Sequence, residues 1–246
     1  PAHGLLVMNG DIKNIDEITY CVDADLVTYK VSGEADYTAS DITYDRQGCA
    51  SFTLIHKGTP VGPVELHVPG IHNVSNALAA LATTMELGFD FKTASEGLAM
   101  FHGTDRRFQY KGKFHGATVI DDYAHHPTEI RASLSAAQNY PHERIICVFQ
   151  PHTYTRTKAF LSDFADALSL ADVVVLADIY AAREQDIYGV SSKDILRLLE
   201  EKQVEAYYFP SFAEIEDFLR EKCMNGDLLI TMGAGNVVNI GEDLLK

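Results

Sequence analysis

The sequence predicts an α/β protein of two domains, and three features of the chain lead to this prediction. Its 246 residues, 46% of them hydrophobic, are enough to form two ordinary hydrophobic cores. Short segments of alternating apolar residues dominate up to about residue 69, whereas strand-like and helix-like segments alternate from about residue 114. The stretch between them, residues 103–116, is polar and contains glycine, so we divide the chain into domains 1–108 and 109–246.

The first domain is expected to combine antiparallel strands with two helices. Turn-forming sequences such as Asp45-Arg46-Gln47-Gly48 separate its strands, which is typical of hairpins. Four segments show the period-two pattern of strands: residues 26–31, 37–44, 51–56 and 64–68. Residues 72–87 and 92–100 predict helices, which end at Gly88 and Gly103.

The second domain is expected to be a mainly parallel sheet with helices on both faces. Its strands are almost continuously apolar, which indicates burial on both sides of the sheet, and helical segments alternate with them. The expected strands are residues 117–121, 145–150, 173–177, 205–209 and 227–232. The expected helices are residues 128–139, 157–170, 192–202 and 212–222.

Composition narrows the class of partner. The net charge of −15 argues against binding to nucleic acid or to a membrane surface, because both require a basic face. Small ligands and proteins remain as partners. The four cysteines lie far apart and form no C-x-x-C pair, so we expect neither a disulfide nor a zinc site.

The chain has the features of a soluble, cytoplasmic protein. Its longest apolar stretches, residues 145–149 and 173–177, are far too short to span a bilayer, and no signal peptide precedes them. The sequence starts at Pro1 and runs almost at once into the apolar residues 5–8, which suggests a fragment of a longer protein.

The most informative stretch is residues 119–129, where an apolar strand ends in a group of titratable side chains. These are Asp121, Asp122, Tyr123, His125 and His126, and the following Pro-Thr-Glu sequence is typical of the first turn of a helix. In open α/β sheets, ligands bind where the carboxyl end of a strand meets the amino end of the next helix. We therefore favour a binding or catalytic role over a surface loop whose acids cap a helix.

A second turn of the same kind follows the next predicted strand. It contains His152 and Arg156, and a proline precedes them as the strand ends. If the two strands are neighbours, His125, His126, His152 and Arg156 share one crevice that suits an anionic small molecule. The alternative is that each turn is only a loop that caps a helix. This explanation is favoured for either turn alone and less favoured when both turns have the same pattern.

Three further groups are candidates for nucleotide binding. His72, Asn73 and Asn76 open the first helix, and a primary amide matches the N6/N7 edge of adenine, although these residues could equally cap the helix. Arg106 and Arg107 lie near the domain boundary, where a guanidinium could bind phosphate, although paired arginines are usually solvated. We interpret the Gly233-Ala234-Gly235-Asn236 turn as tight backbone geometry, and no G-x-x-x-x-G-K-[ST] phosphate loop occurs.

Taken together and in this order, these motifs resemble the Mur ligases of peptidoglycan synthesis. The motifs are Gly70-Ile71-His72-Asn73-Val74-Ser75-Asn76-Ala77, Arg106-Arg107-Phe108, Asp121-Asp122-Tyr123-Ala124-His125-His126-Pro127-Thr128-Glu129, Phe149-Gln150-Pro151-His152 through Arg156-Thr157, and Met232-Gly233-Ala234-Gly235. The resemblance covers nearly the whole chain. It implies the later part of a central ATPase domain followed by a Rossmann-like C-terminal domain.

The resemblance also implies a reaction and its substrates. It implies ATP-dependent ligation of L-alanine to the carboxylate of UDP-N-acetylmuramate through an acyl phosphate, with Mg²⁺ held mostly by residues outside this chain. The same resemblance implies that His72, Asn73 and Asn76 contact adenine and that Asp121 and Asp122 hold the ribose. It implies that Arg106 or Arg107 neutralises the transferred phosphate. The substrate-facing residues that it implies are Tyr123, His125, His126, His152 and Arg156, with His125 and His126 also as catalytic candidates.

Two other functions stay open. One is a related ligase that recycles a murein tripeptide, which shares the His-His-Pro turn but needs a roomier acceptor site. The other is a non-catalytic nucleotide-binding module, which the missing phosphate loop favours. Because that loop and the UDP-binding domain of the family are absent from these 246 residues, we expect the chain alone to be inactive. Some relatives carry arginine where this chain has Thr153, which puts that substrate contact in doubt.

Overall fold

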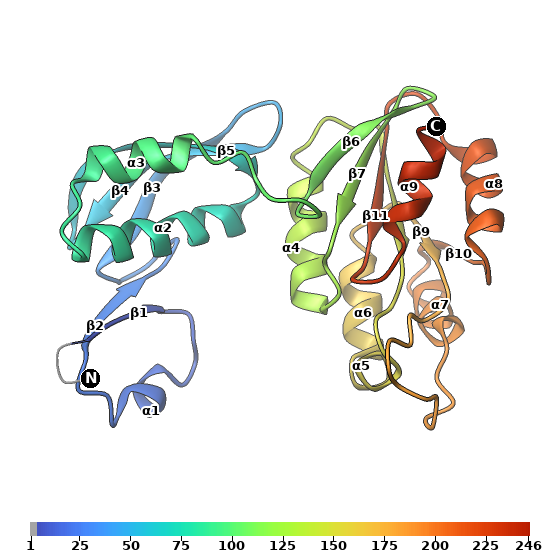
Figure 1. Cartoon of the computed structure of the whole chain (residues 1–246), viewed down its shortest axis with the longest axis horizontal. Helices are drawn as coiled ribbons and strands as arrows, with labels where there is room; N and C mark the ends of the chain where they lie inside the picture. The colour runs from blue at the N-terminus through green and yellow to red at the C-terminus, as the bar shows by residue number, and fades with distance from the viewer. Residues whose placement is uncertain (1–3) are drawn as a thin grey trace. The chain divides into compact units, whose positions relative to one another are not determined.

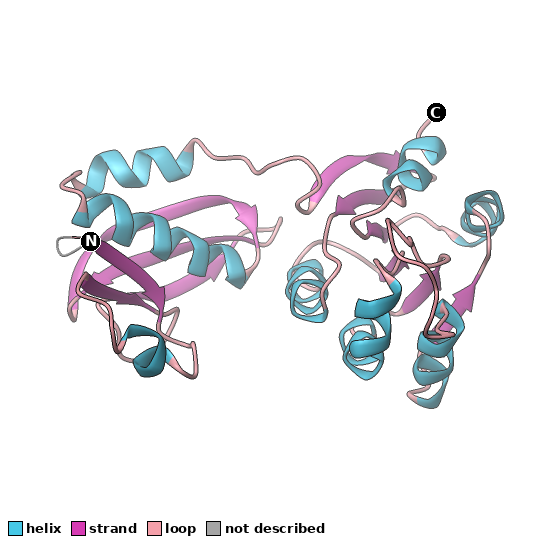
Figure 2. Ribbon diagram, turned by 60° about the horizontal axis from the view of Figure 1, so that its bottom comes forward, coloured by secondary structure: helices cyan, strands magenta, loops and turns pink. Residues whose placement is uncertain are grey.

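The computed structural model describes residues 4–246, which form two compact units (Figure 1). One unit extends to His102 and the other runs from Gly103 to Lys246. This division falls a few residues before the boundary at residue 108 that the sequence suggests. The predicted α/β class is confirmed, since each unit contains one sheet covered by helices (Figure 2).

The N-terminal unit is built on a five-stranded sheet in the order β1-β2-β3-β4-β5. The strands are β1 (Leu5–Asn9), β2 (Asp25–Tyr29), β3 (Tyr37–Tyr44), β4 (Cys49–His56) and β5 (Thr59–Pro69). The predicted antiparallel arrangement is confirmed for β3, β4 and β5. It is wrong for β2, which runs parallel to β3 through the single pair Tyr29 and Tyr37. Strand β1 was not predicted; it runs parallel to β2, because a crossover through the short helix α1 (Ile15–Thr19) returns the chain to the same end of the sheet.

Two longer helices complete this unit, close to the predicted positions. Helix α2 (Ile71–Glu86) buries Val74, Leu78 and Leu81 in one hydrophobic core with strand residues such as Leu54. Helix α3 (Phe91–Ala99) begins with Asp90 as its N-cap, whose carboxylate accepts a hydrogen bond from the Thr93 N–H. The three- and four-residue spacing of the buried α2 side chains is the helical pattern that the sequence shows.

The C-terminal unit contains a six-stranded sheet in the order β10-β9-β8-β11-β7-β6. The strands are β6 (Gln109–Phe114), β7 (Ala117–Asp122), β8 (Arg144–Phe149), β9 (Val173–Leu176), β10 (Glu205–Tyr208) and β11 (Asp227–Met232). All neighbours are parallel except β6 and β7, which confirms the predicted mainly parallel sheet. Strand β6 was not predicted, because its polar, lysine-containing sequence was assigned to the connection between domains.

Helices cover both faces of this sheet, as predicted. Side chains alternate along β8, so that Cys147 and Phe149 enter one core and Ile146 and Val148 enter the other. The first core contains side chains of α4 (Pro127–Ala137), α6 (Leu161–Leu168) and α7 (Ser192–Glu201). The second contains those of α8 (Phe212–Lys222) and α9 (Val238–Leu244), a helix that was not predicted. The single helix predicted over residues 157–170 is two, α5 (Tyr154–Ala159) and α6, because the backbone leaves helical geometry at Phe160.

One expectation about the sheet is wrong and matters for function. Strands β7 and β8 are not neighbours, because β11, the last strand in the sequence, pairs with both of them. The helices after β8 cover one face and the helix after β11 covers the other, so a crevice is expected at the carboxyl ends of these strands.

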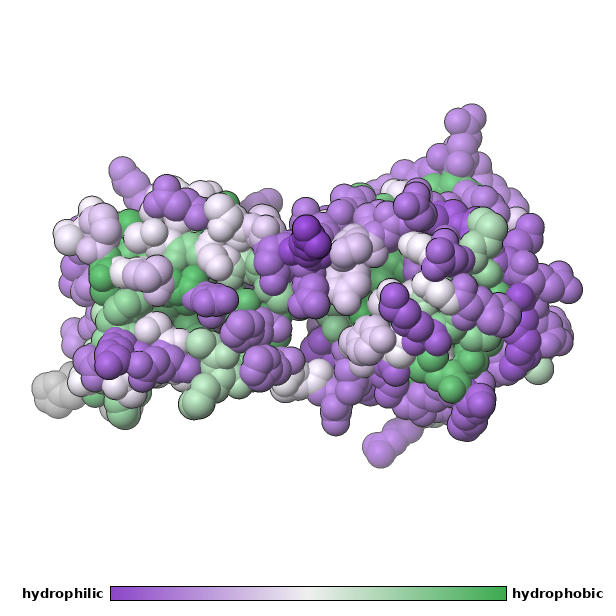
Figure 3. Space-filling view, turned by 90° about the horizontal axis from the view of Figure 1, so that it is seen from above, coloured by the Kyte–Doolittle hydropathy of each residue, from purple (hydrophilic) through white to green (hydrophobic). Residues whose placement is uncertain are grey.

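The surface of both units carries apolar as well as polar areas (Figure 3). In the N-terminal unit, a cavity of about 320 Å³ between α2 and α3 is lined mainly by apolar atoms, including those of Phe89, Ala94 and Leu98. Among residues 4–246, no helix is both long enough and apolar enough to cross a membrane.

Candidate active site

Three loops meet at the carboxyl edge of the C-terminal sheet. They follow β7, β8 and β11, and hydrogen bonds join them: the Gly233 N–H donates to the Asp122 carbonyl, and the Gln150 N–H donates to the Met232 carbonyl, both at 3.0 Å. The loop after β11 therefore links the two histidine-containing loops. Although their strands are not adjacent, the loops come together as the sequence predicted.

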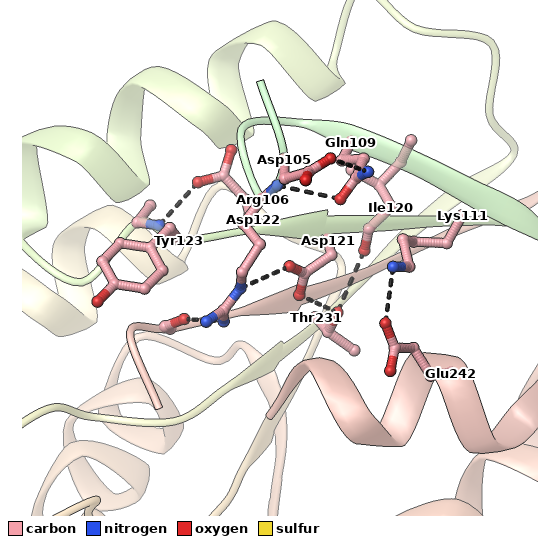
Figure 4. A network of polar contacts seen from close by, with 12 residues as sticks. Asp105, Arg106, Gln109, Lys111, Ile120, Asp121, Asp122, Tyr123, Thr231 and Glu242 are labelled. Carbon is pink, nitrogen blue, oxygen red and sulfur yellow. Dashed lines mark hydrogen bonds and ion pairs between the residues drawn. The ribbon is translucent and has the colours of Figure 1, made fainter. Parts of the chain in front are cut away.

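Arg106 and Asp121 form the base of this site (Figure 4). The Arg106 Nε donates to Asp121 Oδ2 at 3.0 Å, and its Nη2 donates to the Gly233 carbonyl at 2.8 Å. The other oxygen of Asp121 accepts from the Thr231 hydroxyl at 2.7 Å, and the aspartate is fully buried. Two of the guanidinium nitrogens of Arg106 are thus used to join the segment before β6 to the loop after β11.

Asp122 is the second buried carboxylate. Its Oδ1 accepts from the Ala124 N–H, and its Oδ2 accepts from the Phe108 N–H and the Ser133 hydroxyl. Burial raises the pKa of Asp122, and these hydrogen bonds oppose the rise. Asp121 and Asp122 are therefore both buried and both make internal contacts, and their role in holding the ribose stays a prediction.

The Tyr123 ring lies between the arginines and the first histidine. The guanidinium carbons of Arg106 and Arg107 are 4.7 and 5.8 Å from its centroid, which is within the range of cation–π contacts. The edge of the ring also meets His125 at a centroid distance of 5.4 Å. Unlike Arg106, Arg107 forms no salt bridge within the described part of the chain, and it is exposed. Its guanidinium is the more available of the two for an anion.

His126 begins helix α4. Its Nδ1 accepts a hydrogen bond from the Thr128 N–H at 3.3 Å, and its ring packs edge-on against Phe160. The Glu129 carboxylate reaches back to accept from the N–H groups of His125 and His126, which completes a capping box. His126 thus helps to cap α4, and its Nδ1 already accepts a hydrogen bond from the Thr128 N–H.

His125 is oriented differently. Its Nδ1 lies 2.9 Å from the Tyr123 carbonyl and 3.4 Å from the Glu129 carboxylate, both of which are acceptors. These partners assign the ring proton to Nδ1, which leaves the lone pair of the neutral ring on Nε2. The His125 ring meets the His152 ring edge to face at a centroid distance of 5.8 Å.

His152, on the loop after β8, forms a pair with Arg156, which lies within α5. The Arg156 Nη1 lies 3.2 Å from His152 Nδ1 and 3.3 Å from the His152 carbonyl. Because arginine only donates, His152 Nδ1 is the acceptor and the proton of the neutral ring is on Nε2. Burial lowers the pKa of His152, and the charges of Arg156 and His125 lower it further.

The turn after β11 packs closely against the loop after β8. A Cβ at Gly233 would lie 2.7 Å from the Gln150 carbonyl, and a Cβ at Gly235 would lie 2.3 Å from Gln150 Oε1. Only glycine fits at either position. The interpretation of this turn as tight backbone geometry therefore agrees with the packing.

The predicted adenine-binding residues belong to the N-terminal unit. Asn73 donates to the Pro69 carbonyl at 2.8 Å, and its Oδ1 accepts from Asn76 Nδ2 at 3.1 Å. Asn76 is exposed, and its remaining N–H and its carbonyl oxygen match the adenine edge in chemistry. His72 lies beside them at the start of α2 and is partly buried.

Comparison with known sequences decides the family. Residues 106–235 match the Mur ligase, glutamate ligase domain, and residues 1–84 match the Mur ligase middle domain. The chain belongs to the Mur ligase family. This confirms the resemblance that the motifs indicated.

Individual relatives agree with this Mur ligase assignment. The chain is 63% identical over 245 residues to UDP-N-acetylmuramate–L-alanine ligase of Agathobacter rectalis, in a match that covers 100% of this chain and 53% of the relative. It is 50% identical to the ligase of the same name from Lachnospira eligens, of which it covers 54%. The crystal structure of the UDP-N-acetylmuramate–alanine ligase MurC from Thermotoga maritima is 31% identical, with a TM-score of 0.75 over 89% of this chain and 47% of that one. The chain thus spans about half the length of the curated relatives it matches.

Several residues of this Mur ligase site were not predicted from its sequence. They are Gln109, Ser133, Tyr180, Glu184 and Thr231, of which Tyr180 and Glu184 lie on the loop between β9 and α7, far from any motif. A signal was available only for Ser133, a polar residue on the apolar face of α4, where a buried hydroxyl requires a partner. The others become recognisable only when the strand order is known.

Proposed function

We propose that this chain forms the amino-acid-binding part, and some of the ATP-binding part, of a UDP-N-acetylmuramate–L-alanine ligase (MurC). The observation that carries the proposal is the 63% identity to the Agathobacter rectalis ligase over the whole of this chain. The convergence of His125, His152 and Arg156 at one edge of the sheet supports it. The phosphate loop would lie outside these 246 residues.

The proposed reaction proceeds in two steps. The UDP-N-acetylmuramate carboxylate attacks the γ-phosphorus of ATP, which forms an acyl phosphate and releases ADP. The amine of L-alanine then attacks the acyl carbon, and the tetrahedral intermediate expels phosphate to give the amide. Orientation of the reactants and neutralisation of charge provide most of the catalysis in such transfers.

The pair formed by His152 and Arg156 is suited to hold the carboxylate of L-alanine. Arg156 uses Nη1 for His152, which leaves other N–H groups of its guanidinium for a ligand. The neutral His152 ring offers its Nε2–H as a second donor. Two donors on one side orient the amino acid so that its amine is free to attack.

His125 is suited to take the proton that the amine of L-alanine loses. Its Nε2 carries a lone pair because its Nδ1 faces the Tyr123 carbonyl and Glu129. The neighbouring His152 ring places this lone pair beside the proposed carboxylate site. We therefore favour His125 over His126, whose Nδ1 is used to cap α4.

Arg107 is the better candidate to neutralise the transferred phosphate. Arg106 is bound to Asp121 and to the Gly233 carbonyl, so we propose that it fixes the loops, together with Asp121 and Asp122. Arg107 is exposed, and its guanidinium lies 5.8 Å from the Tyr123 ring centroid. A charge-assisted hydrogen bond from its guanidinium to phosphate contributes about 1.5–3 kcal/mol.

ATP would bind through its adenine to the N-terminal unit. The exposed carboxamide of Asn76, oriented by Asn73, has the donor and acceptor that the N6/N7 edge of adenine requires. Within residues 4–246, no group of three or more His, Cys, Asp or Glu side chains could hold a metal ion. We therefore assign no residue of this chain to Mg²⁺, whose protein ligands would lie elsewhere in the enzyme.

The test is a phosphate-release assay on the full-length protein that contains this chain. We expect release that requires ATP, UDP-N-acetylmuramate and L-alanine together. Faster turnover with a murein tripeptide than with L-alanine would identify the recycling ligase instead. Absence of turnover with either acceptor, together with ATP binding, would identify a nucleotide-binding module.

The 246-residue chain offers a second check. In calorimetry we expect it to bind ATP weakly at best, because no phosphate loop is present in this sequence. Tight binding of ATP by this chain would contradict the proposed division of the site.

A further inference from the structure

The loop between β9 and α7 reaches the amino-acid site. Tyr180 on this loop forms an isolated bridge with His152, and its N–H donates to the Pro151 carbonyl at 2.8 Å. Further along, the Glu184 carboxylate accepts hydrogen bonds from the N–H and hydroxyl of Thr155. The loop is therefore attached at two points to the segment that carries His152 and Arg156.

The Tyr180 ring contacts both the loop after β8 and the turn after β11. One face stacks on the His152 imidazole, with a centroid distance of 5.6 Å and an interplanar angle of 17°. Gly235 packs against the same ring, since a Cβ there would lie 2.8 Å from it. Tyr180 still exposes 39% of its surface, so part of the residue borders solvent.

These contacts restrict the His152 ring on three sides. Arg156 holds Nδ1, His125 meets the ring at an angle, and Tyr180 lies nearly parallel to one face. An imidazole without the stacked ring can rotate about its Cβ–Cγ bond, and its Nε2–H then points away from the ligand part of the time. Preorganised donors bind more tightly than mobile ones because less entropy is lost on binding.

We infer that Tyr180 is a positioning residue that holds His152 in the orientation required to bind the carboxylate of the amino-acid substrate. This inference rests on the proposed ligase function. The Tyr180 ring provides this positioning, because the ring stacks on His152, and the Tyr180 hydroxyl is not required. Affinity for the amino acid is therefore expected to depend on an aromatic residue at position 180.

The experiment compares three variants of the full-length protein, with KM and kcat measured for each substrate. Tyr180→Ala removes the ring, and Tyr180→Phe keeps it. Tyr188→Ala is the matched control, because Tyr188 lies on the same loop and is similarly exposed, at 44% against 39%. We expect Tyr180→Ala to raise the KM for L-alanine by about tenfold, in line with one misoriented hydrogen bond to a charged group. The KM values for ATP and UDP-N-acetylmuramate should change by less than about twofold in every variant.

A second readout does not depend on turnover. The modification of His152 by diethyl pyrocarbonate, followed by peptide mass spectrometry, should be faster in Tyr180→Ala than in the parent and unchanged in Tyr180→Phe. Equal KM values for L-alanine in Tyr180→Ala and the parent would overturn the inference, as would a Phe variant as impaired as the Ala variant. If the parent shows no alanine-dependent turnover, the proposed function fails and the substrate part of the inference fails with it; the His152 modification rate then tests separately whether Tyr180 holds the His152 ring.

Discussion

His125 and His152 meet edge to face at 5.8 Å although β11 separates the strands that precede them. The two neutral rings are opposite tautomers, as their Nδ1 partners indicate. His125 carries a lone pair on Nε2, whereas His152 carries its proton there. A ring nitrogen with a lone pair and a ring N–H donor thus belong to neighbouring side chains, which is the combination that the proposed binding of L-alanine requires.

The two adjacent histidines, His125 and His126, should respond differently to mutation. We expect His125→Ala in the full-length protein to lower kcat by about 10²-fold or more, as is typical for loss of a general base. His126→Ala should leave kcat nearly unchanged and lower the free energy of unfolding by about 1 kcal/mol, the usual cost of a lost N-cap. Steady-state kinetics and urea unfolding measure the two effects.

His126→Asn provides the control for this pair, because asparagine is a good N-cap and should restore most of the stability. A larger loss of kcat in His126→Ala than in His125→Ala would reverse the assignment.

Arg156 tests the amino-acid site. We expect Arg156→Ala to raise the KM for L-alanine by about ten- to a hundredfold, which corresponds to about 1.5–3 kcal/mol for hydrogen bonds to a charged group. Arg156→Lys should recover only part of this loss, since an ammonium cannot reproduce the planar fork of donors. Unchanged KM values for L-alanine and for the UDP-sugar in Arg156→Ala would remove this residue from the site.

Substitution of Arg106 should mainly lower stability, whereas substitution of Arg107 should mainly lower catalytic activity. Arg106→Ala leaves the buried Asp121 without its partner, and we expect it to lower the free energy of unfolding by about 3 kcal/mol or more. Arg107→Ala should leave stability within about 0.5 kcal/mol of the parent, as for an exposed side chain, while lowering kcat. The opposite pattern would assign the phosphate contact to Arg106.

The pH dependence of stability follows from His152. Its pKa is lowered in the folded protein by burial, by Arg156 and by His125, so the unfolded chain binds its proton first as the pH falls. The contribution of His152 to stability is therefore fully present above its ordinary pKa of about 6.5 and is lost as the pH falls through the lower, folded value. The difference in unfolding free energy between the parent and His152→Asn should shrink between pH 7.5 and 5, and a constant difference would contradict this.

Substitution of Gly235 tests the close packing around Gln150. Gly235→Ala would place a Cβ against Gln150 and Tyr180, and we expect it to destabilise the protein and to raise the KM for L-alanine. Gly97→Ala is the matched control, since nothing lies within 4 Å of its Cβ position in α3. It should stabilise the helix by about 0.5–1 kcal/mol. Thermal unfolding of both variants checks the contrast.

The sequence predicted those parts of the fold and site that depend on local pattern. Apolar strands followed by helices identified the C-terminal sheet. The prediction that His125 and His152 meet assumed adjacent strands; β11 separates those strands, and the loop after β11 links the two histidine-containing loops instead. The central position of β11 could not be predicted, because strand order is not encoded in any local segment. For the same reason, the contact of Arg106 with Gly233, which lies 127 residues later, had no signal.

The roles of individual polar residues were harder to predict than their proximity. His126 and Asp122 have residue types suited to catalysis, yet one caps a helix and the other accepts three internal hydrogen bonds. Residue type indicates what a side chain can do, whereas its neighbours in the folded chain determine which of those capacities are already used.

The late position of β11 in the sequence has a consequence for biosynthesis. Residues 227–232 are synthesised after β7 and β8, and until they are present these two strands lack the strand that pairs with both of them, so their N–H and C=O groups stay unpaired. Unpaired strand edges of this kind promote aggregation of incomplete chains. The three loops therefore cannot assemble before β11 has been made.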